Sequence, residues 1–447
     1  MGLPRPKTVS TKLERIAELA RQMPEKQLTS LSHHIDLEWM REAYRRTRKD
    51  GAVGIDGQSA EEFGEDLEGN LQRLLDMAKS GRYRAPAVRR VYIPKGKGKT
   101  RPLGIPTFGD KVLQRAIVMV LEAVYEQDFL ECSYGFRPGR SAHQALEAIW
   151  KGTMEMGGGW VLELDIESFY DEIDKKQLQG IVGQRVIDGV VKRLIGKWLN
   201  AGVMEEGQWR RPGKGTPQGG VISPLLANIY LHEVLDLWYS REVKPRMRGR
   251  AFMVRFADDV VMIFERREDA DRVLNVLPKR LGRYGLRLHP DKTRLVDFRR
   301  PPRKKPTPRQ GGSNKPGSYD FLGFTHHWGR SRRGKWVVKR RTMKGRFTRA
   351  LSEIARWCRK ARHLPVRIQH QMLSRKLRGH YAYYGITGNS QMLGHFRHYA
   401  RGIWRKWLDR RGGKRRMTWE RFNLFAQRYP LPTAVAVHSI CRQSASP

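Results

Sequence analysis

The spacing of apolar and polar residues predicts helices in the N-terminal part of the chain. Apolar residues recur at helical spacing over residues 13–78, with an interruption at 51–57, where three glycines favour a tight loop. A short strand of sequence RRVYIP is predicted from Arg89, followed by a Gly/Lys turn at 95–100. Helical spacing resumes near Lys111.

The middle of the chain carries strand signals. Residues 160–165 (WVLELD) predict a largely buried strand, because almost every position is apolar. Residues 252–264 predict two strands on either side of a turn. Residues 300–318 are rich in Pro, Gly, Lys and Arg, which is typical of a loop or linker.

Beyond this linker the pattern is helical again. Phe347, Leu351 and Ile354 lie at helical spacing with Cys358, and Pro365 suits the start of a second helix. A further apolar set at the same spacing indicates a third helix: Leu393, Phe396, Tyr399, Ile403 and Trp407.

The charge of the chain points to a polyanionic partner. Its 447 residues, enough for two or three domains, include 87 Lys+Arg against 45 Asp+Glu, a formal charge of +42. Residues 331–447 alone hold 29 basic and 3 acidic residues, so they cannot neutralise themselves through internal ion pairs. Nucleic acid is the commonest partner of such a surface, and a solvated basic face without function is the alternative.

Other features narrow the class of protein. The N-terminal sequence lacks the apolar region of a signal peptide, and no apolar run is long enough to span a bilayer. We therefore expect a cytoplasmic protein that does not bind membranes. The three cysteines form no CxxC pair, which argues against a disulfide framework and a structural zinc site.

Acidic residues gather at two places in this basic chain. Residues 163–174 contain six carboxylates at the end of the predicted strand, Asp165 among them. Asp258 and Asp259 occupy the turn between two apolar strands. An Asp-Asp pair alone is also a common turn device. Combined with Asp165, it predicts a site for two hard divalent cations that activate a 3′-hydroxyl and stabilise the leaving pyrophosphate.

These residues lie in motifs that resemble those of reverse transcriptases. Leu164–Asp171 (LDIESFYD) resembles their first catalytic motif, and Phe256–Asp259 (FADD) resembles their second, with Phe where many relatives have Tyr. The resemblance implies that Asp165, Asp258 and Asp259 are catalytic and bind two Mg²⁺ ions, with Mn²⁺ a possible substitute. It adds Ile166 to the metal-binding set.

The remaining reverse transcriptase motifs follow in the family order. They are residues 215–228 (GTPQGGVISPLLAN), which contact template and nucleotide in the family, 288–293 (LHPDKT), and 319–324 (YDFLGF), the primer-grip region. The match covers residues from about 30 to about 410.

The resemblance also implies a set of nucleotide-binding residues. Tyr170 stands where the family keeps an aromatic gate against the ribonucleotide 2′-hydroxyl, although simple core packing is the alternative. The segment IPKGKGKTRP contains Gly98-Lys-Thr, but it lacks the earlier glycine of a P-loop, and Pro102 follows it. It instead resembles the fingers motif that holds the triphosphate, with a charged solvent turn as the alternative. The full expected set is Lys95, Arg101, Tyr170, Gln218 and Lys292.

A more specific resemblance is to bacterial group II intron reverse transcriptase–maturases. Residues 51–57 resemble their N-terminal extension, 133–140 (SYGFRPGR) their fingers signature, and 377–385 (LRGHYAYYG) their maturase domain. Basic residues interleaved with aromatics suit RNA, unless those aromatics form the helix core; the aromatics are Tyr381, Tyr383, Tyr384, Trp404 and Trp407. The expected RNA-binding residues are Arg375, Lys376, Arg378, Arg405 and Lys406.

The expected fold is a right-hand polymerase of the α+β class, with fingers, a palm containing an antiparallel sheet, and a helical thumb, joined to a basic helical maturase domain. The expected boundaries are 1–85 for the N-terminal extension and start of the fingers, 86–160 for the fingers, 161–330 for the palm, with a fingers-contributing segment at about 175–215 and the linker at 300–318, and 331–447 for the thumb and maturase domain.

The expected function is RNA-directed DNA synthesis for a group II intron, together with binding of the intron RNA to assist splicing and mobility. The expected partners are that intron RNA, an RNA template, a DNA primer or target, and dNTPs, with the protein at the nucleoid when it acts on DNA. We expect no endonuclease activity, because the His/Asn/Cys-rich module of some relatives does not follow the basic helices. The alternatives are a domesticated reverse transcriptase in repair or phage defence, and a non-catalytic RNA-binding splicing factor.

Overall fold

The protein consists of two compact units that are discontinuous in sequence. The computed structural model describes residues 8–24, 26–96, 99–205, 208–210, 213–215, 219–302, 317–411 and 417–438. The first unit comprises Met1–Ala145 and Leu164–Arg294, and the second comprises Leu146–Glu163 and Leu295–Pro447. Strands β3 (Trp160–Leu164) and β8 (Arg294–Asp297) each contain residues of both units. No helix among these residues has the length and apolar character that a bilayer span requires.

Helix α5 (Phe108–Tyr125) forms the centre of the first unit. Most of its side chains are buried, including those of Val112, Ile117 and Leu121. It begins at Phe108, slightly before the predicted start near Lys111, because the Thr107 side chain accepts a hydrogen bond from the Asp110 nitrogen. The preceding helices are α1 (Val9–Gln22), α2 (Leu37–Arg46), α3 (Ala60–Glu65) and α4 (Leu67–Ser80), with a 3₁₀ turn, η1 (Ser32–His34).

The glycine-rich loop predicted at 51–57 interrupts these helices and packs against the unit's core. The Val53 carbonyl accepts from Arg89 Nε at 3.0 Å, and the Ala52 carbonyl accepts from Lys111 Nζ at 2.6 Å. A Cβ on Gly54 would lie 2.5 Å from the Thr107 Cα, so only glycine fits there. A second break, between α1 and α2, was not predicted from the sequence.

The strands of the first unit include the predicted ones. β1 (Val88–Gly96) contains the RRVYIP segment and pairs antiparallel with β2 (Lys99–Ile105), in a sheet of order β2-β1-β4-β5. Strands β4 (Val203–Glu205) and β5 (Gln208–Arg210) complete that sheet. Strands β6 (Ala251–Phe256) and β7 (Asp259–Phe264) form the predicted antiparallel hairpin at 252–264.

Further helices of the first unit lie between β3 and the β6–β7 hairpin in the sequence, and one more follows the hairpin. They are α7 (Phe169–Glu172), α8 (Lys175–Arg185), α9 (Gly189–Leu199), α10 (Ser223–Leu231) and α11 (Arg267–Gly282). Between α10 and β6 lie two π-helical segments, η2 (His232–Leu237) and η3 (Tyr239–Val243), and a 3₁₀ turn, η4 (Lys244–Arg246).

The second unit begins with a sheet covered by one helix. Strands β9 (Ser318–Phe321), β10 (Phe324–Arg330) and β11 (Trp336–Thr342) form an antiparallel sheet of order β11-β10-β9. Helix α6 (Ala142–Met156) packs on it: Trp150 Nε1 donates to the Val338 carbonyl at 2.9 Å, and Arg340 Nη1 donates to the Leu146 carbonyl at 3.2 Å. The YDFLGF motif therefore lies at the β9–β10 turn.

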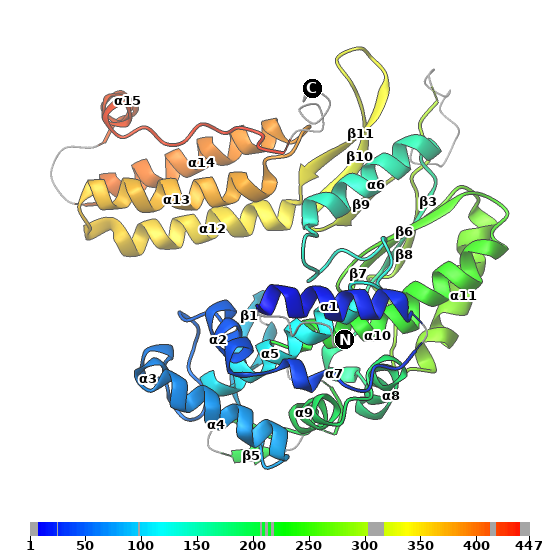
Figure 1. Ribbon diagram of the computed structural model, residues 1–447. Coiled ribbons are helices and arrows are strands. Elements are labelled where there is room, and N and C mark those ends of the chain that lie inside the picture. The colour runs from blue at the N-terminus through cyan, green and yellow to red at the C-terminus, as the bar shows by residue number, and fades with distance from the viewer. Residues whose placement is uncertain are drawn as a thin grey trace. The chain divides into compact units, whose positions relative to one another are not determined.

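The C-terminal helices form a bundle with its own core. The three predicted helices are α12 (Lys344–Lys360), α13 (Val366–Tyr384) and α14 (Ser390–Asp409); the 3₁₀ turn η5 (Ala361–His363) and helix α15 (Trp419–Arg428) were not predicted. The first three long helices run side by side, coloured yellow to orange in Figure 1. Leu377, Phe396, Trp404 and Phe422, the last on α15, are buried in the core of this bundle. Pro365 immediately precedes α13, as its spacing predicts.

Candidate active site

The β6–β7 hairpin presents Asp258 and Asp259 at its tip. Phe256 pairs with Asp259, so Ala257 and Asp258 form the turn between the strands. Residues 260–264 of β7 are all buried, whereas Asp258 is half-buried and Asp259 is exposed. The apolar strands therefore anchor the hairpin in the core and leave the two carboxylates at a supported edge.

A glycine and a neighbouring chain segment brace this turn. Ala257 adopts the left-handed conformation, with φ of 56°. A Cβ on Gly135 would collide with the Ala257 nitrogen, so the fingers signature must carry glycine at this point. The same segment pairs with β6, since Tyr134 N donates to the Arg255 carbonyl at 2.9 Å and Arg255 N donates to the Cys132 carbonyl at 2.7 Å.

Asp165 directly follows β3 and lies beside the LHPDKT motif. His289 N donates to the Asp165 carbonyl at 2.8 Å, and Glu167 N donates to the Arg287 carbonyl at 2.9 Å. Lys292 Nζ lies 3.0 Å from Asp165 Oδ1 and 3.2 Å from Oδ2. The predicted nucleotide-binding lysine is therefore paired with a predicted metal ligand.

The donor chemistry of these residues suits a hard divalent cation. Carboxylate oxygens of Asp165, Asp258 and Asp259 are the ligands that Mg²⁺ prefers, and the Lys292 ammonium shows that a cation fits beside Asp165. Ile166 has an apolar side chain without a donor atom, so only its carbonyl oxygen could serve as a ligand. Among the described residues, no three acidic, His or Cys side chains are grouped closely enough to hold a metal ion. The structure thus contains carboxylates of the kind that bind Mg²⁺. That Asp165, Asp258 and Asp259 bind the same metal ions stays a prediction.

Tyr170, on the short helix α7, is close enough to the aspartate turn for the Asp258 charge to affect its pKa. Burial and, to a smaller extent, the Asp258 carboxylate raise the pKa of its phenol to about 12, against the opposing charges of Arg101 and Arg255. The phenol is therefore protonated at neutral pH and half-buried. Arg101 lies on β2, opposite Ile93, with an exposed side chain.

The GTPQGG motif is fixed at both ends by glycines that no other residue could replace. A Cβ on Gly215 would lie 2.9 Å from the Tyr170 carbonyl oxygen, and one on Gly219 would lie 2.6 Å from the Gly104 carbonyl oxygen. Both glycines have positive φ. The motif therefore begins against the Tyr170 backbone and ends against β2. Gln218 lies between them, outside the described residues, as does the side chain of Lys95.

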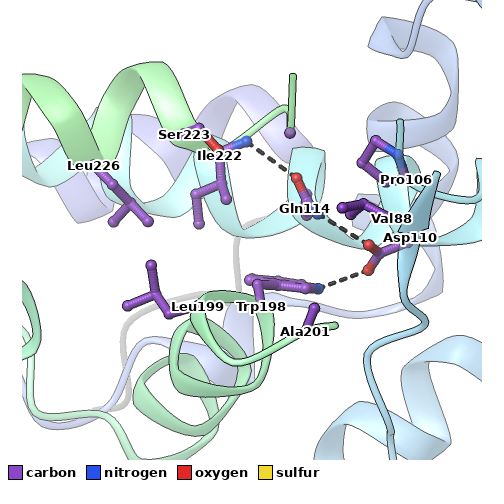
Figure 2. A pocket seen from close by; sticks show the side chains of 11 residues that line it. Val88, Pro106, Asp110, Gln114, Trp198, Leu199, Ala201, Ile222, Ser223 and Leu226 are labelled. Atoms are coloured by element: carbon purple, nitrogen blue, oxygen red, sulfur yellow. Dashed lines mark hydrogen bonds between the residues drawn. The ribbon is translucent and has the colours of Figure 1, made fainter. Parts of the chain in front are cut away.

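A buried polar network holds the chain just after GTPQGG, at Ile222 (Figure 2). Gln114 Oε1 accepts from the Ile222 nitrogen at 3.2 Å, and Gln114 Nε2 donates to Asp110 Oδ2 at 3.0 Å. Trp198 Nε1 donates to Asp110 Oδ1 at 2.6 Å, and Tyr83 donates to the same oxygen. Burial raises the pKa of Asp110 to about 6. The adjoining cavity, of about 10 Å³, has room for at most one water molecule, so it is not a nucleotide pocket.

The predicted RNA-binding residues lie on two helices of the second unit. Arg375, Lys376 and Arg378 on α13 are exposed, as is Lys406 on α14. Arg405 differs: it is partly buried, its Nη1 donates to the Met417 carbonyl at 2.6 Å, and its guanidinium lies 4.4 Å from the Trp419 ring centre. It therefore holds the chain that leads into α15, and its role in RNA binding stays a prediction.

The aromatic residues interleaved with these basic residues fall into two groups. Tyr381 and Trp404 belong to the bundle core, and Trp404 Nε1 donates to Gln369 Oε1 at 3.1 Å. Stacking on RNA is excluded for these two, and for them the core-packing alternative is correct. Tyr383, Tyr384 and Trp407 are only partly buried. Tyr383 donates to the Leu322 carbonyl at 2.8 Å, next to the β9–β10 turn.

The sequence analysis did not identify a buried ion pair that involves the hairpin strand β6. Arg255 and Asp236 are both fully buried and form an ion pair, which Asn228 joins through a hydrogen bond. The sequence does hold a signal, since an arginine within an otherwise apolar strand needs a buried partner. The pattern could not identify Asp236 as that partner, because 19 residues separate the two.

Comparisons with known proteins identify the family. Residues 93–326 match the model of the reverse transcriptase (RNA-dependent DNA polymerase) family, which spans the segments that hold Asp165 and the β6–β7 hairpin. Protein YkfC of Escherichia coli is 37% identical over 297 residues, 58% of this chain and 76% of that protein.

Relatives with functional names match a smaller share. The group II intron-encoded protein LtrA of Lactococcus lactis is 42% identical over 202 residues, 43% of this chain and 33% of LtrA. The protein named nuclear intron maturase 3, mitochondrial, of Arabidopsis thaliana is 30% identical over 181 residues, 36% of this chain and 25% of that protein. The chain thus corresponds to about a third or less of each of these two relatives. On the matched domain and the similarity to YkfC, this chain belongs to the reverse transcriptase (RNA-dependent DNA polymerase) family.

Proposed function

We propose that the protein copies RNA into DNA at the β6–β7 hairpin, with Asp165, Asp258 and Asp259 as the ligands of two Mg²⁺ ions, or Mn²⁺ in their place. The observation that carries this proposal is the braced turn that presents Asp258 and Asp259 inside a reverse transcriptase domain. The ions, when bound, lower the charge barrier to attack of a primer 3′-hydroxyl on the dNTP. The protein's own part is to hold the carboxylates rigidly at one edge.

Nucleotide binding is assigned to the residues around that edge. Arg101 and Lys95, on the β1–β2 hairpin, are proposed to hold the triphosphate, with Lys292 and Gln218 as further contacts. Tyr170 is proposed to exclude the ribonucleotide 2′-hydroxyl. The Asp258 charge contributes to the raised pKa of Tyr170, which supports this role because such an influence requires the ring to lie near that carboxylate.

A second role is proposed for the helical bundle. Residues 331–447, which contain the bundle, carry most of the charge excess of the chain, and Arg375, Lys376 and Arg378 are exposed on one helix. The names of LtrA and of the Arabidopsis maturase connect their proteins with introns. We therefore assign to this chain the binding of group II intron RNA in support of splicing and mobility, in addition to an RNA template and a DNA primer or target.

The division into fingers, palm, thumb and maturase domain belongs to the same proposal. The fingers include the β1–β2 hairpin, the palm includes β3, β6 and β7, and the thumb and maturase domain begins near residue 331. The site of action is the cytoplasm, at the nucleoid when DNA is the target, because a chain of charge +42 associates with polyanions.

Two assays on the same purified protein test the two roles. The first is extension of a DNA primer on an RNA template with dNTPs and Mg²⁺; absence of products contradicts the polymerase role and favours an RNA-binding splicing factor. The second is binding and splicing of a group II intron RNA, with an unrelated structured RNA of equal length as control. Equal affinity for both RNAs and no effect on splicing would contradict the maturase role and favour a domesticated polymerase.

A further inference from the structure

Arg255 and Asp236 form an ion pair with no exposure to solvent. Arg255 Nε donates to Asp236 Oδ1 at 2.7 Å, and Nη2 donates to Oδ2 at 2.5 Å. Burial alone would raise the pKa of Asp236, but the Arg255 charge, the neighbouring His232 side chain and the hydrogen bonds from Arg255 together outweigh burial and hold the pKa below its usual range. Desolvating two charges often makes such a pair no more stabilising than apolar side chains of the same size. The ion pair lies next to the aspartate turn, and we therefore consider a role for it other than stability.

The third nitrogen of the guanidinium reaches the turn itself. Arg255 Nη1 donates to the Ala257 carbonyl at 3.1 Å and to Asn228 Oδ1 at 2.9 Å. Ala257 has a φ of 56°, a conformation that costs a residue with a Cβ about 1 kcal/mol or more. The hydrogen bond to its carbonyl favours this conformation, and the next residue in the chain is Asp258.

Asn228 connects the guanidinium to the segment around Gly135, which runs beside β6 and braces the turn. Its Nδ2 donates to the Gly135 carbonyl at 2.6 Å, while its Oδ1 accepts from Arg255. Gly135 is the residue whose missing side chain leaves room for Ala257. One arginine thus joins the turn, the Gly135 segment and the helix α10 that carries Asn228.

The main chain presents Asp236 to this arginine from a π-helical segment. η2 (His232–Leu237) continues α10. Because a π-helix has wider turns than an α-helix, the side chains after Asn228 point in other directions than they would on a continued α-helix. Asn228 and Asp236 both reach Arg255 from this continuous helical stretch. Interruptions of this kind are frequent at functional sites, which agrees with a role for the pair in positioning.

We propose that Arg255, oriented by Asp236, is a positioning residue that fixes the Ala257 turn so that Asp258 and Asp259 are set for metal binding. This inference rests on the proposed function, since it assumes that these carboxylates bind the ions. Arg255 does not touch substrate; it acts through the Ala257 carbonyl. Lysine in its place keeps the charge but cannot reach Asp236, Asn228 and Ala257 together, because it lacks the planar fork.

The test compares Arg255→Lys with a matched control, Arg185→Lys. Arg185 also forms a largely buried ion pair in the first unit, with Nε 2.8 Å from Asp128 Oδ2, but its other contacts are carbonyls near α1 rather than the aspartate turn. The measurements on full-length protein are the Kd of Mn²⁺, from the electron paramagnetic resonance signal of the free ion, the Mg²⁺ dependence of primer extension, and the thermal unfolding temperature.

Both variants are expected to unfold at lower temperature, and only Arg255→Lys is expected to bind Mn²⁺ more weakly, by roughly tenfold. It should also require correspondingly more Mg²⁺ for DNA synthesis. An Arg255→Lys protein with unchanged Mn²⁺ affinity overturns the inference and leaves a purely structural ion pair. If Arg255→Lys does not fold, Asp236→Asn replaces it, with the same expectation and the same contradicting result. A wild-type protein that neither binds Mn²⁺ nor extends primers contradicts the proposed function instead, so the two failures are distinguishable.

Discussion

The Lys292 ammonium lies within hydrogen-bonding distance of both carboxylate oxygens of Asp165, at 3.0 and 3.2 Å. The two side chains are about half and one-third exposed, so solvent screens the pair and each can also serve another partner. With Asp165 as a metal ligand, as proposed, we expect Lys292 to compete with the metal ion for Asp165 when no nucleotide is bound, and to become available to a triphosphate once a metal ion takes its place.

This competition can be measured with Lys292→Met. The variant should reach half-maximal primer extension at an Mg²⁺ concentration about two- to fivefold lower than wild type, because a partly exposed ion pair has an effect of that size. Its KM for dNTP should rise, since one contact to the triphosphate is lost. The measurement is an Mg²⁺ titration at saturating dNTP and a dNTP titration at saturating Mg²⁺. A higher Mg²⁺ requirement in the variant would contradict the competition.

Removal of a carboxylate from the hairpin tip should stop DNA synthesis. Asp258→Ala is expected to lower dNTP incorporation on an RNA template by more than about tenfold while leaving the fold intact, because both ions depend on the shared ligands. Asp76→Ala is the control, since Asp76 is an exposed carboxylate on α4. The readouts are primer extension and circular dichroism. An Asp258→Ala protein with a tenth of normal activity in Mg²⁺ would contradict the site assignment.

Sugar selection should depend on the ring of Tyr170. Tyr170→Ala is expected to raise the kcat/KM for rNTP relative to dNTP by at least about tenfold, because the proposed clash with the 2′-hydroxyl is removed. Tyr170→Phe keeps the ring and should keep the discrimination. If the ratio is the same in wild type and Tyr170→Ala, the ring is a packing residue only.

RNA binding and DNA synthesis should be separable. Neutralising Arg375, Lys376 and Arg378 to Gln should weaken binding of group II intron RNA and lower the slope of log Kd against log salt by roughly two to three, because fewer counterions are released. Asp259→Asn should stop DNA synthesis and spare binding.

The matched control for that triple variant neutralises three exposed basic residues in the first unit, Arg73, Lys79 and Arg82. Titrations at several salt concentrations beside a splicing assay distinguish the cases. If the α13 variant keeps the wild-type slope and splicing activity, the maturase role of this segment is contradicted.

The buried carboxyl of Asp110 predicts a pH dependence of stability. Its pKa is raised from 3.8 to about 6 by burial, so its contribution is complete below about pH 4 and is lost as the pH rises through 6. This difference corresponds to roughly 3 kcal/mol. Urea unfolding of wild type and Asp110→Asn between pH 4 and pH 7 checks it. The stability of wild type relative to the variant should fall across this range, and a constant difference would contradict the raised pKa.

The main helices and strands, and the place of Asp258 and Asp259 at a hairpin turn, could be predicted from the sequence, because periodicity and motif order are local properties. The apolar runs of β3, β6 and β7 and the helical spacing of α12 to α14 correspond to the observed elements. The contacts that arrange the site are not local: Lys292 meets Asp165 across 127 residues, and Arg255 meets Asp236 across 19. Spacing cannot reveal such pairs, nor the burial that places Trp404 in a core.

The discontinuity of the two units has a consequence for how the chain folds as it is synthesised. Residues 146–163 belong to the second unit, yet they leave the ribosome before residues 164–294 of the first. Trp150 and Leu146 find their hydrogen-bond partners in β11 only after about 190 further residues have been made. Residues 295–447 alone therefore lack part of the second unit, and a nascent chain that stops near residue 294 leaves α6 without the sheet on which it packs.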